Sequence, residues 1–489
     1  MDPLTFRSWI LLALVVLMAV FINAPLRVKV TRRLRIPLNL VTVPPAALVV
    51  GLATTSVTWA DVGHGIVGSH GVQPYSILVL LLVLAWLCTA LDLTGGLSMV
   101  ALAVAQRAAG SRGGGRRFFG VTYALGFVFT VLTNNDVAAL TLTPMTAYFT
   151  QAMQVTPYPF LLAEFLATNI ASIVFFMGNV NNIIVAEAAG MNFATYAAWM
   201  VLPAVGSFVV TGIVLFIQYR RQIPTQGDLP DVDPRAALRQ PRAAGVHTTL
   251  LVGLTVALAV SSFYAIPVWL ISLPFGAAAA LATLLGDLWP YVRHPPPRKR
   301  EADVASATTR GNPAARFQRR LARYLPVTAD ILARLPYSIF PFTFCMFVFV
   351  QAFTTHGWTP RLAWLLTQLC PDPTAAAFSV GYLSALASVV FNNIPAALFF
   401  VNAISSPEFH ADRTTRRAAY LAVAIGADLG AHLTIPASLA GLLWSSLAEA
   451  KGIHFGSLRF IRSCAWSFPL TVASACGILA AEVAVMARR

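Results

Sequence analysis

Long apolar segments, separated by short polar or basic stretches, follow one another along the whole chain. We read ten of them as transmembrane helices, because each is close to or above the length that a bilayer requires. Eight of the ten lie at about 8–23, 37–58, 160–189, 196–219, 246–263, 268–289, 418–447 and 464–486. The other two begin near Tyr75 and Tyr337 and are unusually long, so we expect breaks at Gly95-Gly96 and at His356-Gly357.

Two further apolar segments, 118–153 and 374–404, carry a polar group near the middle. Thr133-Asn134-Asn135-Asp136 interrupts the first and Asn392-Asn393-Ile394-Pro395 the second, and both runs share the pattern Asn-Asn-x-x-Ala-Ala-Leu. The flanks of the first run have roughly 16 residues each, fewer than the ~20 of a full span. We therefore predict two re-entrant helical hairpins with these runs at their tips. A kinked full span is the alternative for the first.

Two of the spans contain polar interruptions of their own. Span 160–189 is interrupted at 178–182, and span 418–447 at 426–438. Each half of the chain thus carries a hairpin followed by a broken helix, and an odd number of spans per half inverts the second half relative to the first. We predict inverted repeats over 1–221 and 246–489, a cytoplasmic linker over 222–245 and a cytoplasmic loop over 291–336. The broken helices should lie at the membrane midplane.

Composition agrees with an all-α polytopic membrane protein. Hydrophobic residues make up 57% of the chain and charged residues 11%, and the mean hydropathy is +0.71. The net charge of +15 does not indicate nucleic-acid binding, because the basic residues cluster in short loops between apolar spans. Charge counting puts these loops in the cytoplasm and both termini outside. We expect a plasma (inner) membrane protein whose first apolar stretch is a retained helix.

We find no motif for enzymatic catalysis or for metal binding in the sequence. The five cysteines are not at metal-ligand spacing, and small buried apolar residues describe them adequately. There is no Gly-x-x-x-x-Gly-Lys-Ser/Thr run, no cluster of His and acidic ligands, and no nucleophile beside a base. We predict a transporter that is not an enzyme and has no cofactor and no metal site. A channel is a further option, although closed hairpins favour alternating access.

The candidate binding residues are those of the two tips and the two breaks. Broken helices expose free N–H and C=O groups, and asparagine can both donate and accept, so a polar solute or ion could bind there. The predicted substrate- or ion-binding set is Thr133, Asn134, Asn135, Asp136, Asn179, Asn182, Asn392, Asn393, Asp428, His432, Thr434 and Ser438. Asp136 and Asp428 are the proton-coupling candidates, since intramembrane carboxylates are costly and usually functional. The alternative is that both only cap half-helices.

These motifs resemble the ion transporter superfamily, and most closely the ArsB-type arsenite efflux permeases. The run from Leu132 to Pro144 is similar to the family's Asn-Asp-x-x-Ala-Leu-x-Leu-Thr-Pro segment, and Asn392–Pro395 to its Asn-Asn-x-Pro segment. Gly426–Gly430 with Ser438–Trp444 resembles its Gly-x-Asp-Leu-Gly … Ser-Leu-Ala-x-Leu-Leu-Trp segment, and Gly178–Ile183 fits its Asn-x-x-Asn-Ile break. The likeness covers nearly the whole chain, except for the polar stretch 293–334.

The resemblance implies export of arsenite or antimonite in exchange for protons. A sodium/proton antiporter or a sodium-coupled anion carrier of the same superfamily is the alternative; carboxylate carriers favour Ser-Asn-Thr at the tips, which is absent here. The second break departs from the family's Gly-Pro-x-x-Thr-Pro-x-Gly-Ser, because Gly430–Ser438 loses one proline and a glycine. The implied partners are the lipid bilayer, a small inorganic solute and protons. A soluble ATPase subunit, which some relatives bind, and a homodimer are further candidates.

The charge map predicts which loops face the cytoplasm. Single cysteines introduced by Arg112→Cys, Asp231→Cys and Ala307→Cys should react with an impermeant thiol reagent only after the membrane is opened, because these loops are cytoplasmic. Gly68→Cys should react in intact cells. Labelling of the Ala307→Cys variant from outside would overturn the map.

Overall fold

The computed structural model describes residues 4–23, 26–29, 35–38, 41–67, 74–109, 114–224, 233–261, 264, 266–293, 324–335, 337 and 339–487. These residues are almost entirely helical, as the sequence predicts. Within them, the one sheet pairs β1 (Leu26–Lys29) with β2 (Arg35–Leu38) in an antiparallel register, Leu26 opposite Leu38. The sequence predicts a loop for this basic stretch, so the two strands are a correction. The four positions named for the labelling experiment lie outside the described residues.

The chain divides into two compact units. Unit 1 comprises residues 1–78, 104–231 and 337–489, and unit 2 comprises residues 79–103 and 232–336. The helices of unit 1 are α1 (Phe6–Asn23), α2 (Val43–Ala53), α3 (Trp59–Val67), α6 (Gly114–Leu132), α7 (Asn135–Ala152), α8 (Tyr158–Ser172), η1 (Phe176–Gly178), α9 (Val180–Ala188), α10 (Phe193–Tyr219), α16 (Ile339–Thr355), α17 (Trp358–Leu369), α18 (Pro373–Phe391), α19 (Asn393–Ser405), α20 (Arg413–Leu429), η3 (Gly430–His432), η4 (Ile435–Ala437), α21 (Leu439–Ala450), α22 (Ser457–Cys464) and α23 (Ser467–Ala487). Both predicted tips and both predicted site breaks belong to this unit.

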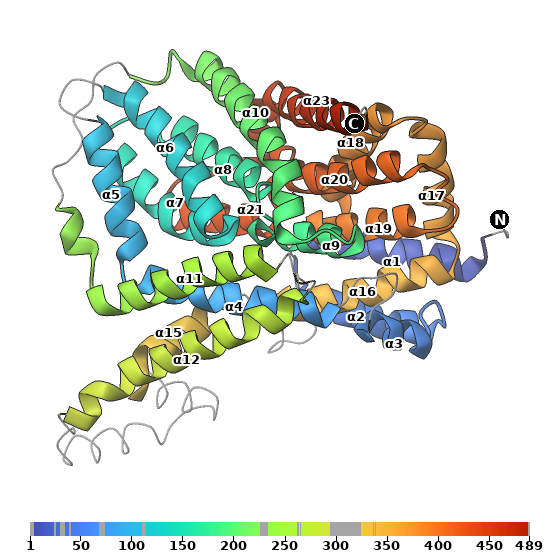
Figure 1. The fold of residues 1–489 in the computed structure, drawn as a ribbon, viewed down its shortest axis with the longest axis horizontal. Helices are drawn as coiled ribbons and strands as arrows, with labels where there is room; N and C mark the ends of the chain where they lie inside the picture. Colours follow the sequence, from blue (N-terminus) through green and yellow to red (C-terminus); the bar gives the residue numbers. More distant parts are fainter. Residues whose placement is uncertain are drawn as a thin grey trace. The chain divides into compact units, whose positions relative to one another are not determined.

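The two polar runs interrupt helices at the positions that the sequence predicts. Thr133 and Asn134 separate α6 from α7, and Asn392 alone separates α18 from α19. In Figure 1 the group α6–α8 and the group α18–α20 form two clusters of helices within unit 1. Their re-entrant character stays a prediction.

The second group is packed through small residues. A Cβ atom on Gly426 of α20 would lie 2.0 Å from the Ser384 side-chain oxygen and 2.2 Å from the Gly381 carbonyl oxygen of α18. One turn later, a Cβ on Gly430 would lie 2.6 Å from the Ser388 Cβ. Glycines four residues apart let two backbones approach closely, which is how apolar helices associate where lipid replaces water. Close packing therefore fixes α20, and with it the second break, on α18.

Corresponding elements of the two halves make corresponding contacts. The first helix of each group packs on the third, α6 on α8 and α18 on α20. The second hairpin helix packs on the post-break helix of the other half, α7 on α21 and α19 on α9, and α10 packs on α23. The first and second halves of the chain are thus interleaved throughout unit 1.

Some predicted bounds are wrong. The expected span 37–58 is not one helix: α2 begins only at Val43, since prolines occupy its first turn, and it ends before Thr55, whose φ is +54°. The first site break runs from Ile173 to Asn179, earlier than predicted, because Asn179 caps a helix that resumes at Val180. The second runs from Gly430 to Ser438.

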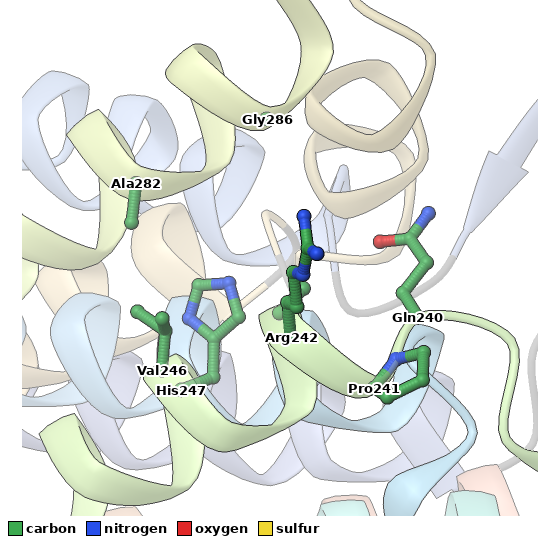
Figure 2. Close-up of a pocket in the computed structure, with 8 residues that line it drawn as sticks. Gln240, Pro241, Arg242, Val246, His247, Ala282 and Gly286 are labelled. Carbon is green, nitrogen blue, oxygen red and sulfur yellow. The ribbon is translucent and has the colours of Figure 1, made fainter. Parts of the chain in front are cut away.

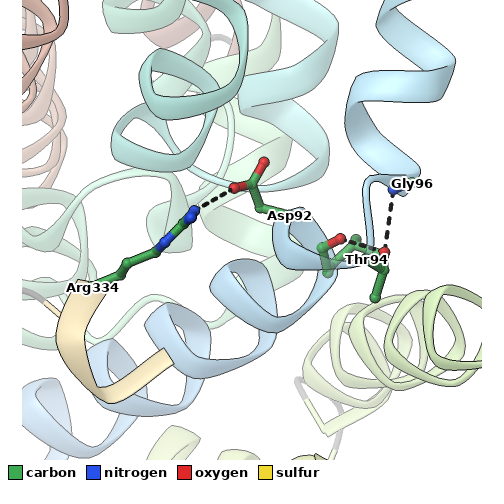
Figure 3. Close-up of polar contacts among 5 residues, drawn as sticks. Asp92, Thr94, Gly96 and Arg334 are labelled. Carbon is green, nitrogen blue, oxygen red and sulfur yellow. Dashed lines mark hydrogen bonds and ion pairs between the residues drawn. The ribbon is translucent and has the colours of Figure 1, made fainter. Parts of the chain in front are cut away.

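Unit 2 is described by α4 (Pro74–Leu93) and α5 (Gly96–Ala109), each of which lies mostly within it, together with η2 (Pro234–Ala237), α11 (Pro241–Ser261), α12 (Val268–Arg293) and α15 (Pro326–Arg334). The predicted break is present, and α4 and α5 meet at a 62° bend. Figure 3 shows how polar contacts hold it: Thr94 Oγ1 accepts the Gly96 N–H, and Arg334 of α15 forms an ion pair with Asp92 at 3.2 Å. The predicted linker and loop are only partly described, and α11 and α15 start inside them.

By length and apolar composition, four helices in the described part of the chain could cross a membrane. They lie at Phe193–Tyr219, Trp269–Trp289, Pro373–Phe391 and Ser467–Met486, and the bent pair α4–α5 would make a fifth. Many large apolar side chains on such helices are exposed, among them Phe216, Leu285 and Leu470. An exposed apolar surface of this kind suits lipid, and the number of ten spans stays a prediction.

Because α18 and α20 approach closely, replacing a glycine by alanine should destabilise the protein at their contact but not at an open position. Gly426→Ala should lower the free energy of unfolding by about 1–3 kcal/mol, because the new methyl group overlaps Ser384 and Gly381. Gly120→Ala in α6 is the matched control, since its Cβ would meet nothing within 4 Å. It should be neutral or slightly stabilising. Thermal unfolding of the purified protein in detergent measures both, and equal midpoints would contradict the packing.

Candidate functional site

The centre of the candidate site is a buried carboxylate that three amides surround. Asp428 Oδ1 accepts from Asn179 Nδ2 at 2.7 Å and from Asn181 Nδ2 at 3.1 Å, and Oδ2 accepts from Asn182 Nδ2 at 2.8 Å. The Asp428 side chain has no exposed surface. Each donor is separated from Asp428 by about half the chain, so the cluster joins the first break to the end of α20.

Local structure explains why these groups converge. A Cβ atom on Gly178 would lie 2.3 Å from the Ser172 carbonyl oxygen, so only glycine allows this tight turn after α8. Asn179 then caps α9, and Asn182 in its first turn also donates to the Ser172 carbonyl at 2.9 Å. The turn therefore directs the amides of α9 toward α20. Hydrogen bonds to a charged acceptor contribute about 1.5–3 kcal/mol each, and several are needed to offset the burial of a carboxylate.

The tip of the second hairpin is strained and reaches both breaks. Asn392 has φ = +71° and ψ = 158°, a region that side chains other than glycine rarely adopt, at a cost of about 1–3 kcal/mol. In this conformation Asn392 Nδ2 donates to the Pro436 carbonyl at 3.2 Å. Asn393 Nδ2 lies 3.4 Å from Asn181 Oδ1. Both side chains are buried, and within the described structure the Oδ1 atom of each has no hydrogen-bond partner.

The second break contributes three of the predicted residues. His432 ends η3, is fully buried, and neither of its ring nitrogens has a partner among the described residues. Thr434 precedes η4. Ser438 caps α21 by accepting the Gly441 N–H at 3.0 Å, and a Cβ on Gly441 would lie 2.1 Å from the Ile435 carbonyl oxygen. The break is thus a compact turn that places His432 in the protein interior. A histidine side chain can be uncharged there, unlike a lysine or an arginine.

The tip of the first hairpin is built from local contacts. Thr133 Oγ1 donates to the Phe129 carbonyl at 2.6 Å, and Asn134 Oδ1 accepts the Val137 N–H at 2.9 Å, which caps α7. Asn135 is buried, and Asp136 lies in the first turn of α7, where the helix dipole favours a negative charge. Among described residues, no hydrogen bond joins these four side chains to the Asp428 cluster.

The predicted set is therefore only partly gathered by the structure. Hydrogen bonds connect Asn179, Asn182 and Asp428, and reach Asn393 through Asn181. The Asn392 side chain is connected to the second break by the hydrogen bond that it donates to the Pro436 carbonyl. Asn181 was not predicted; the signal that could have found it is the repetition of Asn at 179, 181 and 182 beside one carboxylate.

Unit 2 contains a cavity of its own. The cavity, of about 470 Å³, lies between α11 and α12. Figure 2 shows Arg242 and His247 of α11, two of the residues that line it, extending toward α12. None of the predicted site residues lines this cavity. All five cysteines are buried and free, and across the described residues no three His, Cys, Asp or Glu side chains are grouped to hold a metal ion.

The helical architecture and the buried polar cluster at helix breaks are features of membrane transporters. Residues 10–426 match the family model CitMHS, described as "Citrate transporter", so the chain belongs to this family. The family lies within the ion transporter superfamily, as the motifs indicate.

Known relatives agree with this assignment. The chain is 27% identical over 368 residues to the arsenical pump membrane protein of Escherichia coli K12, covering 74% of this chain and 76% of that protein. It is 28% identical over 368 residues to the protein of the same name from Yersinia enterocolitica, with the same coverage. The solved YdaH transporter of Alcanivorax borkumensis has a similar fold, with a TM-score of 0.51 at 14% identity, over 98% of each chain. The predicted resemblance to arsenical pumps is confirmed.

The Asp428 cluster predicts strongly coupled mutations. Asn182→Ala should destabilise the protein by about 1–3 kcal/mol, because it leaves Asp428 Oδ2 without its donor. Asp428→Asn should also destabilise, since its new NH₂ group would face an amide donor. The double variant should lose less than the sum of the single losses by at least about 1 kcal/mol. Equilibrium unfolding of the four proteins in detergent measures the coupling.

A remote pair provides the control. Asp372 caps the exposed start of α18 by accepting the Ala375 N–H, and it shares no hydrogen-bond partner with Asp428. Asp372→Ala and Asp428→Asn should therefore add to within about 0.5 kcal/mol. Additivity in the Asn182–Asp428 pair would contradict the cluster.

Proposed function

We propose that this protein is a secondary active transporter of the plasma membrane that exports arsenite or antimonite in exchange for protons. The family is one of membrane transporters, and relatives that cover three quarters of the chain are named arsenical pumps. The candidate site adds a chemical argument of its own.

The observation that carries the proposal is a pair of buried acceptors without donors. Asn392 Oδ1 and Asn393 Oδ1 lie at the second tip, and neither has a partner within the described residues. A buried polar atom without a partner is costly, so a bound solute that donates hydrogen bonds would be stabilised there. Arsenous acid is neutral at neutral pH and carries hydroxyl groups that can donate. A carboxylate anion presents only acceptors.

The pairing of helices supports alternating access. In inverted repeats the two hairpins should make equivalent contacts, and each hairpin helix here packs on the post-break helix of the other half, α7 on α21 and α19 on α9. Rocking of such paired elements around the site would open it to each side in turn. Asp136 and Asp428 are the carboxyl groups at the tips and breaks, and are the first candidates for proton exchange.

The alternative is a sodium/proton antiporter or a sodium-coupled anion carrier. Its support is the family description, "Citrate transporter", which names a carboxylate substrate. A sodium ion could also use the two free amide oxygens, because sodium prefers oxygen ligands. Substrate assays must therefore include citrate and sodium. A soluble ATPase subunit and a second copy of the chain are proposed partners.

Growth and flux assays test the function. Expression in a bacterial host without its own arsenite exporters should raise arsenite and antimonite resistance severalfold and lower accumulated arsenite. Everted vesicles should take up arsenite when a pH gradient is imposed, and dissipation of the gradient should abolish this uptake. The Asp428→Leu variant, which removes the acceptor of three amides, is the inactive control.

Two results would contradict the proposal. Unchanged arsenite accumulation together with sodium/proton exchange would move the protein to the antiporter alternative. Citrate uptake that depends on sodium, with no arsenite flux, would identify an anion carrier.

A further inference from the structure

A second buried carboxyl group lies away from the candidate site. Glu164 of α8 has no exposed surface, and its Oε1 accepts a hydrogen bond from Thr143 Oγ1 of α7 at 2.8 Å. Its Oε2 has no partner among the described residues. The buried Thr146 hydroxyl faces the same carboxyl group and likewise has no well-formed hydrogen bond in the described structure. Two polar atoms are thus left unsatisfied at one place.

One proton would satisfy both atoms. An ionised Glu164 would be a buried charge with a single donor, an arrangement that proteins avoid. A proton on Oε2 removes the charge and creates an O–H group. This group can donate a hydrogen bond to the hydroxyl oxygen of Thr146. The Thr143–Glu164–Thr146 group therefore has the form of a site for a proton.

Asp428 has the opposite surroundings. Its two oxygens receive three amide donors, and hydrogen bonds donated to a carboxylate favour its ionised form. Two carboxyl groups in such contrasting surroundings divide their roles: one stays ionised and the other carries the proton. Asp428 is by position a first candidate for proton exchange, but on this reading it stays the anion that orders the asparagines, and the proton is carried elsewhere.

Helix α8 connects the two places. Glu164, Thr168 and Ser172 are spaced four residues apart, so they lie on one face of α8, and all three are buried. Eight residues of helix span about 12 Å. At the far end, the Ser172 carbonyl accepts from Asn182, which itself binds Asp428. A buried polar face thus runs from Glu164 to the asparagine cluster.

The position of Glu164 between α7 and α8 suits it to coupling. Helix α7 begins at the first hairpin tip, and α8 ends at the first break. A negative charge on Glu164 would require new donors, which only a movement of α7 against α8, or entry of water, could supply. Protonation is thereby linked to the geometry of the tip and the break.

We propose that Glu164 is the proton-binding site of the exchange cycle, and this rests on the proton-coupled function proposed above. Glu164 takes up a proton from one side and releases the same proton to the other, while solute moves in the opposite direction. The elements packed against α8 carry ionisable groups of three kinds. The carboxyl groups and the imidazole are Asp136, Asp428 and His432, the phenols are Tyr123, Tyr148, Tyr196, Tyr219 and Tyr420, and the guanidinium groups are Arg116, Arg117, Arg413, Arg416 and Arg417. None of them hydrogen-bonds Glu164 in the described structure.

The experiment compares Glu164→Gln with wild type in proteoliposomes. Glutamine reproduces the shape of a protonated glutamate and keeps an acceptor for Thr143 and a donor for Thr146. The variant should keep arsenite binding and arsenite/arsenite exchange within about twofold. Its arsenite accumulation driven by a pH gradient should fall at least tenfold, and its exchange rate should lose the pH dependence of wild type. Glu449→Gln, at an exposed position on α21, is the matched control and should behave as wild type.

Each outcome decides a separate point. If wild type itself shows no arsenite flux coupled to pH, the proposed function fails. If wild type is coupled and Glu164→Gln is equally coupled, Glu164 is not the proton site, although the proposed function stands. If Glu164→Gln does not fold, Thr143→Val and Thr146→Val are measured instead, because both keep the carboxyl group. They should shift the pH profile of transport, and an unchanged profile in both would overturn the inference.

Discussion

The hydrogen bonds between Asp428 and the three asparagines are the interaction on which the candidate site depends. They are the place where a half-helix of the first half of the chain, α9, is held to the end of α20 in the second. Removal of the carboxylate would leave three amides without an acceptor in an apolar interior, and removal of the amides would leave a buried charge. Neither half can complete this centre alone, so the polar cluster also specifies how the halves meet.

The polar runs of the sequence predicted the positions of the tips well. Asn134 and Asn392 fall where helices stop, because an asparagine pair inside an apolar segment has few ways to satisfy its amides in a continuous helix. The break before Asn179 was misplaced for a related reason. Asparagine is a good helix cap, so α9 already begins after Asn179. The polar residues up to Asn182 had suggested that the helix was still interrupted there.

Other features could not be read from the sequence. Two such features are the strained backbone of Asn392 and the side-chain oxygens of the second tip that have no partner in the described structure. Both depend on how α19, α9 and the second break pack together, and the pattern of residues along the sequence does not reveal such tertiary contacts. The same is true of Asn181, which gains importance only when Asp428 is placed beside it. From the sequence alone Glu164 resembles a residue at a helix interface, and only the missing partner of its Oε2 atom in the described structure separates it from one.

The long separation between the partners has a consequence for biogenesis. Asn182 and Asp428 are 246 positions apart, and a ribosome adding about 5–20 residues per second needs roughly 12–50 seconds to bridge them. During that interval the first half enters the bilayer with its three amides and no carboxylate to receive them. Until Asp428 is synthesised, these amides need other polar partners or water, because the hydrocarbon of a bilayer offers none.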